Sequence, residues 1–480
     1  MAGEHTRGTG RGGFMTPADA WIWYLEGDPR LRWTISAVMV LDATPDWDRL
    51  VARFDRASRH DPRFRQKVIE PPMRAAPPRW TTDRWFDLDY HVRRVAAPAP
   101  GTLADVLAFA ARSAMSGLDK DRPLWQATLV EGLTGGRAAL VVKLHHALTD
   151  GVGGLQLALH LVDPHPGEDP QDPLPDAPEA ENIGRIGLWG EITRFQLRRA
   201  FAAGDRMTRA IVPTMRRSVT DPAGLAREAR SLVASVVRAV RPVLDTSSPV
   251  MTARSLSWEY GTLAVPFDEL RSAARTAGFT LNDAFLAGLT GGLRRYHEAH
   301  GSVPAELRMN MPISLRREGD PEGGNRVTIM RFAIPIAEAD VRTRLGQIHT
   351  AARAARDEPS VPHFDTIATG LAPLTPLAVA PMATHMDFTA SNVPGYPHAV
   401  HICGAEVLQV YPFGPTAGGA MNATMMSYRD SCCIGVNTDA EAVPDAPVLY
   451  DCLADGFEEV LAVGGRRHRP VIVGDPGSLT

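Results

Sequence analysis

Two adjacent histidines, His145 and His146, end an apolar run from Ala138 to Leu144. Apolar and β-branched residues predict a buried strand, and an imidazole desolvated at its end stays neutral near pH 7 and acts as a base. Asp150 and Gly151 follow in a glycine-rich turn, where the carboxylate locks the loop instead of carrying the proton. The alternative is a histidine pair that only caps a strand, but the complete HHxxxDG pattern favours acyl transfer with a histidine general base.

Four further sequence patterns occur in order around this motif. They are Thr16-Pro17-Ala18-Asp19-Ala20, Pro123-Leu124-Trp125, Leu281-Asn282-Asp283 and Ser391-Asn392-Val393-Pro394-Gly395. Together with HHxxxDG they resemble the bacterial wax ester synthase/diacylglycerol acyltransferase family, a branch of the acyl-CoA-dependent acyltransferases, from about Phe14 to about Val460. One departure is Tyr396, where the family usually has a proline, so the turn after Gly395 is expected to differ in shape.

The resemblance implies both a fold and a mechanism. The implied fold class is α/β, with two chloramphenicol-acetyltransferase-like lobes of mixed sheets, flanked by helices, around a tunnel. An acyl-CoA is the co-substrate and diacylglycerol or a long-chain alcohol is the acceptor, with no cofactor and no metal ion. The resemblance assigns the base to His146, which the residues alone do not distinguish from His145, and it requires no covalent acyl-enzyme.

Further residues are expected to support this chemistry. Strand alternation points His145 away from His146, where it is a structural donor. Asn282, at a helix start, either assists the oxyanion or the acceptor hydroxyl, or it caps the helix. Asp150 orients the loop, with Arg316 as a candidate partner. The expected substrate-binding residues form two groups. Pro123, Leu124 and Trp125 also support the site from behind, and Asn392, Pro394 and Gly395 shape a turn that lines the tunnel.

The chain is predicted to divide into four segments. Residues 1–13 are polar and glycine-rich, lack the apolar core of a signal peptide and are expected to be disordered. Residues 14–162 form the first acyltransferase lobe, which carries HHxxxDG, and residues 251–480 form the second. Residues 163–250 connect them: Asp163 to Glu181 has seven acids, six prolines and no Lys or Arg, which is typical of an exposed linker, and a basic helical connector follows.

Periodicity predicts the main elements of both lobes. In the first lobe we expect helices over residues 17–26, 47–58, 103–116 and 155–161, a strand over 34–41, and a hairpin of strands 125–131 and 137–144. In the second lobe we expect helices over 267–277 and 281–299, and strands over 261–265, 308–313, 327–334, 388–391, 407–411, 420–428 and 431–436.

Composition argues against several other classes of protein. A chain of 480 residues with 44% hydrophobic residues buries large cores, and a formal net charge of -4 gives no basic field for nucleic acid. Four late cysteines without CxxC spacing suggest reduced thiols in the cytoplasm. Three prolines interrupt the longest uncharged window, residues 366–384, which argues against a membrane-spanning helix. No further ligands accompany the pair His398 and His401, so no metal site is expected.

The connector from Ile183 to Val243 combines helical periodicity with repeated arginines, among them Arg194, Arg198 and Arg199. A basic amphipathic helix lies on an anionic membrane, and each arginine near the surface contributes about 1 kcal/mol. The alternative is a solvated connector that packs on both lobes. The first interpretation predicts a cytoplasmic protein, peripherally associated with the inner face of the plasma membrane or with lipid inclusions.

These observations predict an acyl-CoA-dependent O-acyltransferase that makes neutral lipid. The expected product is triacylglycerol from diacylglycerol, with wax esters from fatty alcohols as a second product. Two alternatives remain: an acyltransferase for another specialised alcohol, and a non-catalytic lipid-binding protein. Intact His145, His146, Asp150 and Asn282 favour the enzyme, because a scaffold has no need of all four.

Overall fold

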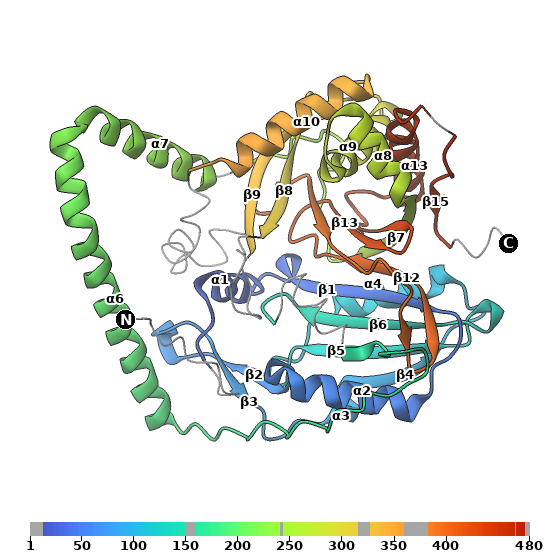
Figure 1. Ribbon diagram of the computed structural model, residues 1–480, viewed down its shortest axis with the longest axis horizontal. Helices are drawn as coiled ribbons and strands as arrows, with labels where there is room; N and C mark the ends of the chain where they lie inside the picture. Colours follow the sequence, from blue (N-terminus) through green and yellow to red (C-terminus); the bar gives the residue numbers. More distant parts are fainter. Residues whose placement is uncertain are drawn as a thin grey trace.

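The computed structural model describes residues 13–148, 160–240, 243–314, 327–359, 383–465 and 467–475. Two α/β lobes lie one above the other, and a long helix stands beside them (Figure 1). Each lobe contains one large sheet with helices packed on it. The predicted class of mixed sheets flanked by helices is therefore confirmed.

The first lobe is built on a six-stranded sheet with the order β11-β12-β1-β6-β5-β4. Its strands from the first half of the chain are β1 (Thr34–Leu41), β4 (Val92–Ala96), β5 (Trp125–Glu131) and β6 (Ala138–His145). Its helices are α1 (Pro17–Leu25), α2 (Trp47–His60), α3 (Leu88–His91) and α4 (Leu103–Met115), and β2 (Gln66–Ile69) and β3 (Arg79–Thr82) form a separate ribbon. Short 3-10 turns cover Pro29–Leu31, Pro62–Arg65, Pro72–Arg74 and Thr134–Gly136. The apolar strand β6 thus lies inside the sheet, between β1 and β5.

The second lobe is built on a seven-stranded sheet with the order β15-β7-β14-β13-β10-β8-β9. Its strands are β7 (Trp258–Pro266), β8 (Glu306–Ser314), β9 (Val327–Pro335), β10 (Phe388–Val393), β13 (Met421–Tyr428), β14 (Ser431–Asp439) and β15 (Ile472–Val473). The helices α8 (Phe267–Ala277), α9 (Leu281–Ala299), α10 (Val341–Arg356) and α13 (Ala446–Ala462) cover the face turned away from the first lobe (Figure 1). β10 runs parallel to β8 and β13, whereas the other neighbouring strands are antiparallel, so the sheet is mixed.

Two strands from the second half of the chain belong to the first lobe. β11 (His401–Ile402) and β12 (Ala405–Phe413) extend the first sheet, where β12 pairs with β1 along its length. The expectation that residues 251–480 form one separate lobe is wrong at this crossover. Burial explains the exchange, because Val407, Tyr411 and Phe413 are fully buried against the first core.

Helix α4 lies at the junction between the lobes, in contact with β7 on one side and with β1 and β6 on the other. Nearby, the ring of Tyr260 stacks on Phe413 with 4.0 Å between centroids, and its hydroxyl donates to Ser36 Oγ at 3.4 Å. Burial raises the pKa of Tyr260 well above its ordinary value, so the hydroxyl keeps its proton and remains a donor. These contacts join the two sheets through packed side chains.

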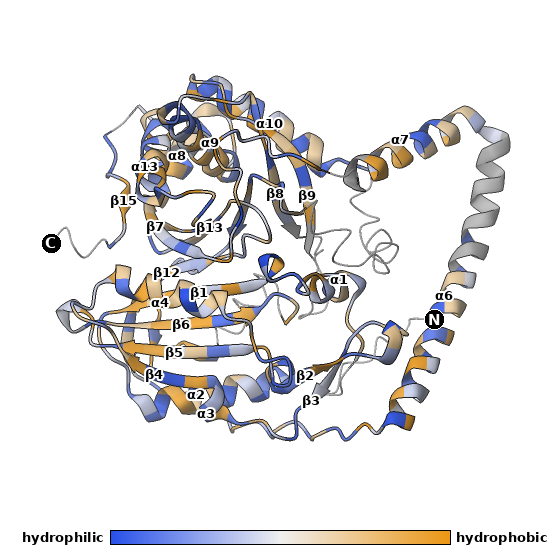
Figure 2. Cartoon of the chain, turned by 180° about the vertical axis from the view of Figure 1, so that it is seen from behind, coloured by the Kyte–Doolittle hydropathy of each residue, from blue (hydrophilic) through white to orange (hydrophobic). Residues whose placement is uncertain are grey.

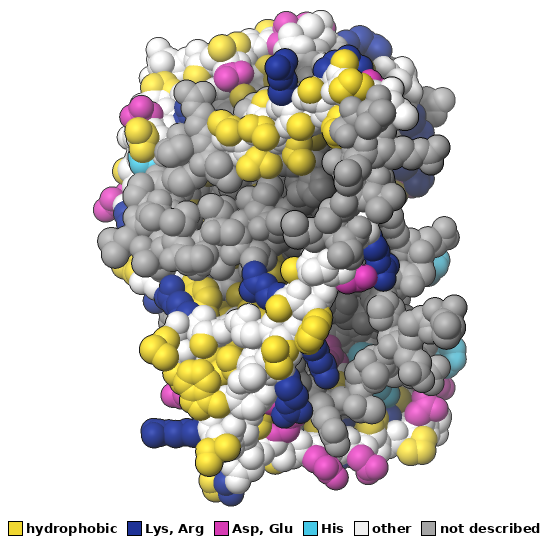
Figure 3. All heavy atoms as spheres, turned by 90° about the vertical axis from the view of Figure 1, so that its left-hand side faces the viewer, with side chains coloured by type: hydrophobic (Ala, Val, Ile, Leu, Met, Phe, Trp, Pro, Cys, Tyr) yellow, Lys and Arg dark blue, Asp and Glu magenta, His cyan; other side chains and the backbone are white. Residues whose placement is uncertain are grey.

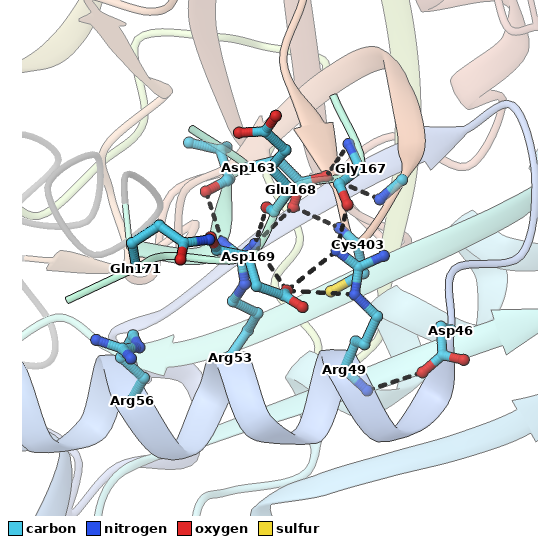
Figure 4. A network of polar contacts seen from close by, with 12 residues as sticks. Asp46, Arg49, Arg53, Arg56, Asp163, Gly167, Glu168, Asp169, Gln171 and Cys403 are labelled. Carbon is cyan, nitrogen blue, oxygen red and sulfur yellow. Dashed lines mark hydrogen bonds and ion pairs between the residues drawn. The ribbon is translucent and has the colours of Figure 1, made fainter. Parts of the chain in front are cut away.

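The acidic linker is exposed over most of its length, as expected, but its start is held against α2. Figure 4 shows Arg49 and Arg53 reaching from α2 toward Asp163 and Asp169. Arg53 contacts Asp163 at 3.0 Å and both side chains are almost fully buried. Asp163 also accepts from the backbone N–H groups of Cys403 at 2.9 Å and of its successor, Gly404, at 2.8 Å. The expected exposed linker is therefore, at its start, a buried tie between α2 and the β11–β12 turn.

The basic connector forms two helices, α6 (Arg185–Thr220) and α7 (Pro222–Val240), which stand away from the lobes (Figure 1). Apolar and polar residues alternate along the part of α6 that is coloured by hydropathy in Figure 2. One side of its first turns contacts the first lobe: Phe195 packs on Phe14 with 4.6 Å between ring centroids, and Glu191 pairs with Arg79. α6 is thus attached at one end and on one face.

Periodicity located most elements but missed several, two of which are rich in arginine. β1 and α8 have the predicted bounds, whereas β4, α10 and α13 were not predicted. β4 contains two adjacent arginines and α10 contains four, so their apolar signal is weak. Residues 1–12 of the predicted disordered start lie outside the described residues, and its last residue, Gly13, is bound to the first lobe: the Gly13 carbonyl accepts from the Trp80 N–H at 2.8 Å. Most of the helix expected over 155–161 lies outside the described residues.

Candidate active site

The histidine pair lies at the end of β6. β6 is antiparallel to β1 and β5, and the register places His145 opposite Thr34. His145 is 2% exposed, whereas His146 is half-buried in the turn that follows the strand. The sheet therefore brings the end of β6 beside the start of β1, and the two histidines have different surroundings.

Both ring nitrogens of His145 have polar neighbours from the scaffold. Nδ1 accepts from the backbone N–H of Ala147 at 3.0 Å, and Nε2 lies 3.1 Å from Oε1 of Glu26. The edge of the Trp23 ring packs against the imidazole with 5.7 Å between centroids. Because Nδ1 is an acceptor here, the proton of the neutral ring belongs on Nε2, which faces Glu26. His145 is thus part of the framework of the site.

His146 is held through its backbone and its ring by one residue, Trp33. The His146 N–H donates to the Trp33 carbonyl at 2.8 Å, and the two rings meet edge to face with 5.5 Å between centroids and an angle of 86°. Trp33 immediately precedes β1, so the β1–β6 pairing fixes its position. Sequence reasoning identified neither Trp33 nor Glu26, although an acidic residue at the end of an aromatic, apolar helix was an available signal.

The Pro123-Leu124-Trp125 motif supports β6 from within the core. The Leu124 carbonyl accepts from the His145 N–H at 3.0 Å, and the Trp125 indole N–H donates to the Phe64 carbonyl at 2.8 Å. All three residues are buried, and Trp125 stacks on His91 with 4.6 Å between centroids. The motif is therefore buried in the core of the first lobe, beside the end of β6.

Two of the other motifs are helix starts. Thr16 is the N-cap of α1, its side chain accepting from the Asp19 N–H, and Pro17 is the first helical residue. In α9 the N-cap is Thr280, which forms a reciprocal capping box with Asp283. Asn282 lies one residue beyond Leu281, inside the first turn, so the expectation that Asn282 caps the helix is wrong.

The remaining motif ends β10 and forms a close turn. A Cβ atom on Gly395 would lie 1.8 Å from the Ser427 carbonyl oxygen, so only glycine fits there. Asn392 and Pro394 are exposed, and Tyr396 packs against the core of the first lobe. Within the described residues no hydrogen bond or ring contact joins Asn282 or Asn392 to either histidine. The motif is thus a turn that reaches the first lobe from the second.

Asp150, Gly151 and Arg316 lie outside the described residues, so the orientation of the loop by Asp150 and its pairing with Arg316 stay predictions. In the described part of the chain no group of three or more His, Cys, Asp or Glu residues is arranged to hold a metal ion. Among the helices that the structure describes, none combines the length and apolarity required to cross a bilayer.

Comparison with known proteins agrees with the order of the motifs. Residues 15–285 match the wax ester synthase/diacylglycerol acyltransferase catalytic domain, and residues 323–460 match the C-terminal domain of the same family. A Mycobacterium tuberculosis H37Rv protein assigned by name as a diacylglycerol O-acyltransferase is 38% identical over 463 residues, covering 94% of this chain and 92% of that protein. A second protein of that strain, assigned the same activity, is 31% identical over 95% of this chain and 98% of its own length.

Solved structures show the same fold. The wax ester synthase/diacylglycerol acyltransferase from Marinobacter aquaeolei VT8 superposes with a TM-score of 0.64 at 22% identity, over 94% of this chain and all of that one. The first condensation domain of the calcium-dependent antibiotic synthetase superposes with a TM-score of 0.63 at 14% identity, over 96% and 98% of the two chains. With family matches that span most of its length, this chain belongs to the wax ester synthase/diacylglycerol acyltransferase family and is an acyltransferase.

Proposed function

We propose that this protein transfers the acyl group of an acyl-CoA to the free hydroxyl of diacylglycerol, which makes triacylglycerol, and that fatty alcohols are accepted as well. The observation that carries the proposal is the HHxxxDG histidine pair at the end of a buried strand in a chain of this family. The curated relatives named as diacylglycerol O-acyltransferases support diacylglycerol as the acceptor.

In the proposed mechanism His146 is the general base. Its imidazole takes the proton of the acceptor hydroxyl while the oxygen attacks the thioester carbonyl carbon. The tetrahedral adduct then breaks its carbon–sulfur bond, and the imidazolium returns the proton to the thiolate of coenzyme A. The products are an ester and free coenzyme A, and no acyl-enzyme forms. Such proton transfer supplies about a hundredfold to ten-thousandfold in rate.

The surroundings of His145 support the choice of His146. A general base needs a ring nitrogen that reaches the substrate proton directly or through one water molecule. In His145 one nitrogen accepts from Ala147 and the other faces Glu26, in a ring that is 2% exposed. His146 is the less buried of the two and follows the strand. Asp150 keeps its proposed role as the carboxylate that orients the loop.

A test of this function is the release of coenzyme A from palmitoyl-CoA by the purified protein with dioleoylglycerol or hexadecanol, beside a folded His146→Ala variant. We expect release with dioleoylglycerol that the variant lacks. Release with hexadecanol alone would replace diacylglycerol by a fatty alcohol as the acceptor. Folded protein that releases no coenzyme A with either acceptor would contradict the proposal and indicate another alcohol.

The proposal includes peripheral contact with a membrane or lipid droplet through α6. Opposite its attached face, the first half of this helix exposes Ile186, Trp189, Leu197 and Phe201 by 90%, 43%, 53% and 76%. Their spacing places them on one side of the helix. Figure 3 shows apolar side chains gathered on this face of the molecule with Lys and Arg among them.

The charges near this stripe suit an anionic surface. Arg194, Arg198 and Arg199 are exposed on the same helical segment. The acidic Glu191 on that segment is engaged by Arg79 of the first lobe, so it does not cancel their charge outward. A helix with apolar side chains on one face and arginines around them binds at the boundary between headgroups and acyl chains. An anionic lipid surface is therefore the proposed partner.

A further inference from the structure

A buried carboxylate lies next to the histidine pair, at the far end of the helix that Thr16-Pro17-Ala18-Asp19-Ala20 begins and outside each of the family motifs. Glu26 is the residue that ends α1, and its side chain is 11% exposed. Its Oε1 accepts from the Trp33 N–H at 2.9 Å and lies 3.1 Å from Nε2 of His145. Its Oε2 lies 3.9 Å from the ammonium group of Lys120. One carboxylate thus contacts the residue before β1 and the last residue of β6.

Two backbone attachments of His146 lead to residues that Glu26 contacts. One is the peptide bond to His145, and the other is the hydrogen bond from the His146 N–H to the Trp33 carbonyl. The ring of His146 also rests against the edge of Trp33. A displacement of Glu26 would therefore be passed to the backbone and to the ring of His146 together.

The surroundings of Glu26 favour its charged form. Burial by itself raises the pKa of Glu26, but His145, the Trp33 N–H and Lys120 together outweigh burial and hold that pKa below its ordinary value. A carboxylate beside Nε2 of His145 favours the tautomer with its proton on that nitrogen, which matches the acceptor role of Nδ1 toward Ala147. The charge of Glu26 and the hydrogen bond from Ala147 thus favour the same tautomer of His145, with the proton on Nε2.

We infer that Glu26 is a positioning residue for the acyl transfer, which holds His146 in place through Trp33 and through His145 without touching either substrate. The inference rests on the proposed function, in which His146 is the base. The Glu26 carboxylate then determines the fraction of time that His146 spends in the geometry for proton transfer. Binding of acyl-CoA and of the acceptor does not depend on it.

The variant that tests this role is Glu26→Gln, which keeps the shape of the side chain and removes its charge. The matched control is Glu70→Gln, because Glu70 also binds α1, accepting from the Trp23 indole N–H at 2.6 Å, without contact to either histidine. For Glu26→Gln we expect kcat to fall by about ten- to a hundredfold, with KM for both substrates unchanged within about twofold. Loss of a nearby anion also destabilises an imidazolium, so the acidic limb of the pH–kcat profile should move to lower pH.

The outcomes separate this inference from the proposed function. A folded Glu26→Gln variant with the kcat and the pH profile of the control would overturn the positioning role while the wild type remains active. An inactive wild type would contradict the proposed function itself. If Glu26→Gln does not fold, Glu26→Asp keeps the charge and withdraws it by about 1.5 Å, and we expect a lower kcat with the acidic limb unmoved. Wild-type kcat in a folded Glu26→Asp variant would contradict the positioning role.

Discussion

The adjacent histidines His145 and His146 have different surroundings. His145 ends the strand and turns into the framework, where Ala147 and Glu26 contact its two nitrogens. His146 is the first residue beyond the strand and is less buried. Ala147 and Glu26 thus contact the ring of His145, whereas the ring of His146 lies against Trp33.

His91 shows how burial changes a histidine elsewhere in the same core. It is fully buried, stacks on Trp125, and its Nδ1 lies 2.7 Å from the Trp125 carbonyl. Burial is the main cause that lowers its pKa from 6.5 to about 4. The folded state therefore favours the neutral ring, and the unfolded state binds more protons between these two values.

We predict that His91 makes the folded protein less stable as the pH falls. Its contribution is complete above about pH 6.5 and is lost as the pH falls toward about 4, which amounts to about 3 kcal/mol over that range. In His91→Phe the fall of the melting temperature between pH 7 and pH 4.5 should be smaller than in the wild type. Equal falls in the two proteins would show that His91 does not titrate in this way.

At the scale of elements, the crossover hairpin of β11 and β12 depends on a buried charge pair. Asp163 accepts from the backbone at the β11–β12 turn and pairs with Arg53 of α2 (Figure 4). Arg53 also donates to the Val162 and Glu168 carbonyls at 2.9 and 2.7 Å. The Arg53–Asp163 pair thus neutralises one buried carboxylate and satisfies several backbone groups. These groups lie where α2, the start of the linker and the β11–β12 turn meet.

We predict that Arg53→Met destabilises the protein by about 3–5 kcal/mol, because Asp163 would remain buried and charged without its partner. The matched control is Arg49→Met, one helical turn earlier, whose partner Asp169 is 57% exposed. An exposed pair contributes less than about 1 kcal/mol, so the control should melt close to the wild type. Thermal unfolding of the two variants measures the difference, and similar melting temperatures would contradict a buried tie.

On the scale of the whole molecule, the chain crosses between its lobes more than once. The first half leaves through α6 and α7, and the second half returns β12 to the edge of β1. An uncovered edge at β1 would expose unpaired backbone groups, and β12 satisfies them. The α6 segment, in contrast, leaves one apolar face open to solvent. The chain thus covers the edge of its first sheet with its own strand but leaves the apolar face of α6 exposed.

We predict that the open face of α6 carries membrane binding. Reversing Arg194, Arg198 and Arg199 to Glu should remove about 3 kcal/mol of attraction to anionic vesicles, which is more than a hundredfold in affinity. The control reverses three exposed arginines of α10, Arg342, Arg353 and Arg356, with the same change of net charge. Co-sedimentation with anionic liposomes should be lost only in the α6 variant. Full co-sedimentation of that variant would show that α6 is not the anchor.

The sequence by itself determined the family and most of the elements. HHxxxDG after an apolar run indicates both the strand and the family, because a strand period and a sequence motif are local properties of the chain. Thr16 and Pro17 likewise mark a helix start through local hydrogen bonding. The sequence left open whether Asn282 caps α9, because Thr280 and Asn282 are both good capping residues, and only the reciprocal bonds of Thr280 with Asp283 decide between them.

Only the tertiary structure decided which distant residues surround the histidine pair. Glu26 and Trp33 lie more than a hundred residues before the pair, and in the folded chain Glu26 contacts His145 while Trp33 contacts His146. Two further contacts are equally non-local: β12 lies beside β1, and Asp163 binds the backbone of the β11–β12 turn. Hydrophobic periodicity records whether a residue is buried but not against which partner, so contacts between remote segments are fixed by packing and strand pairing in the folded chain.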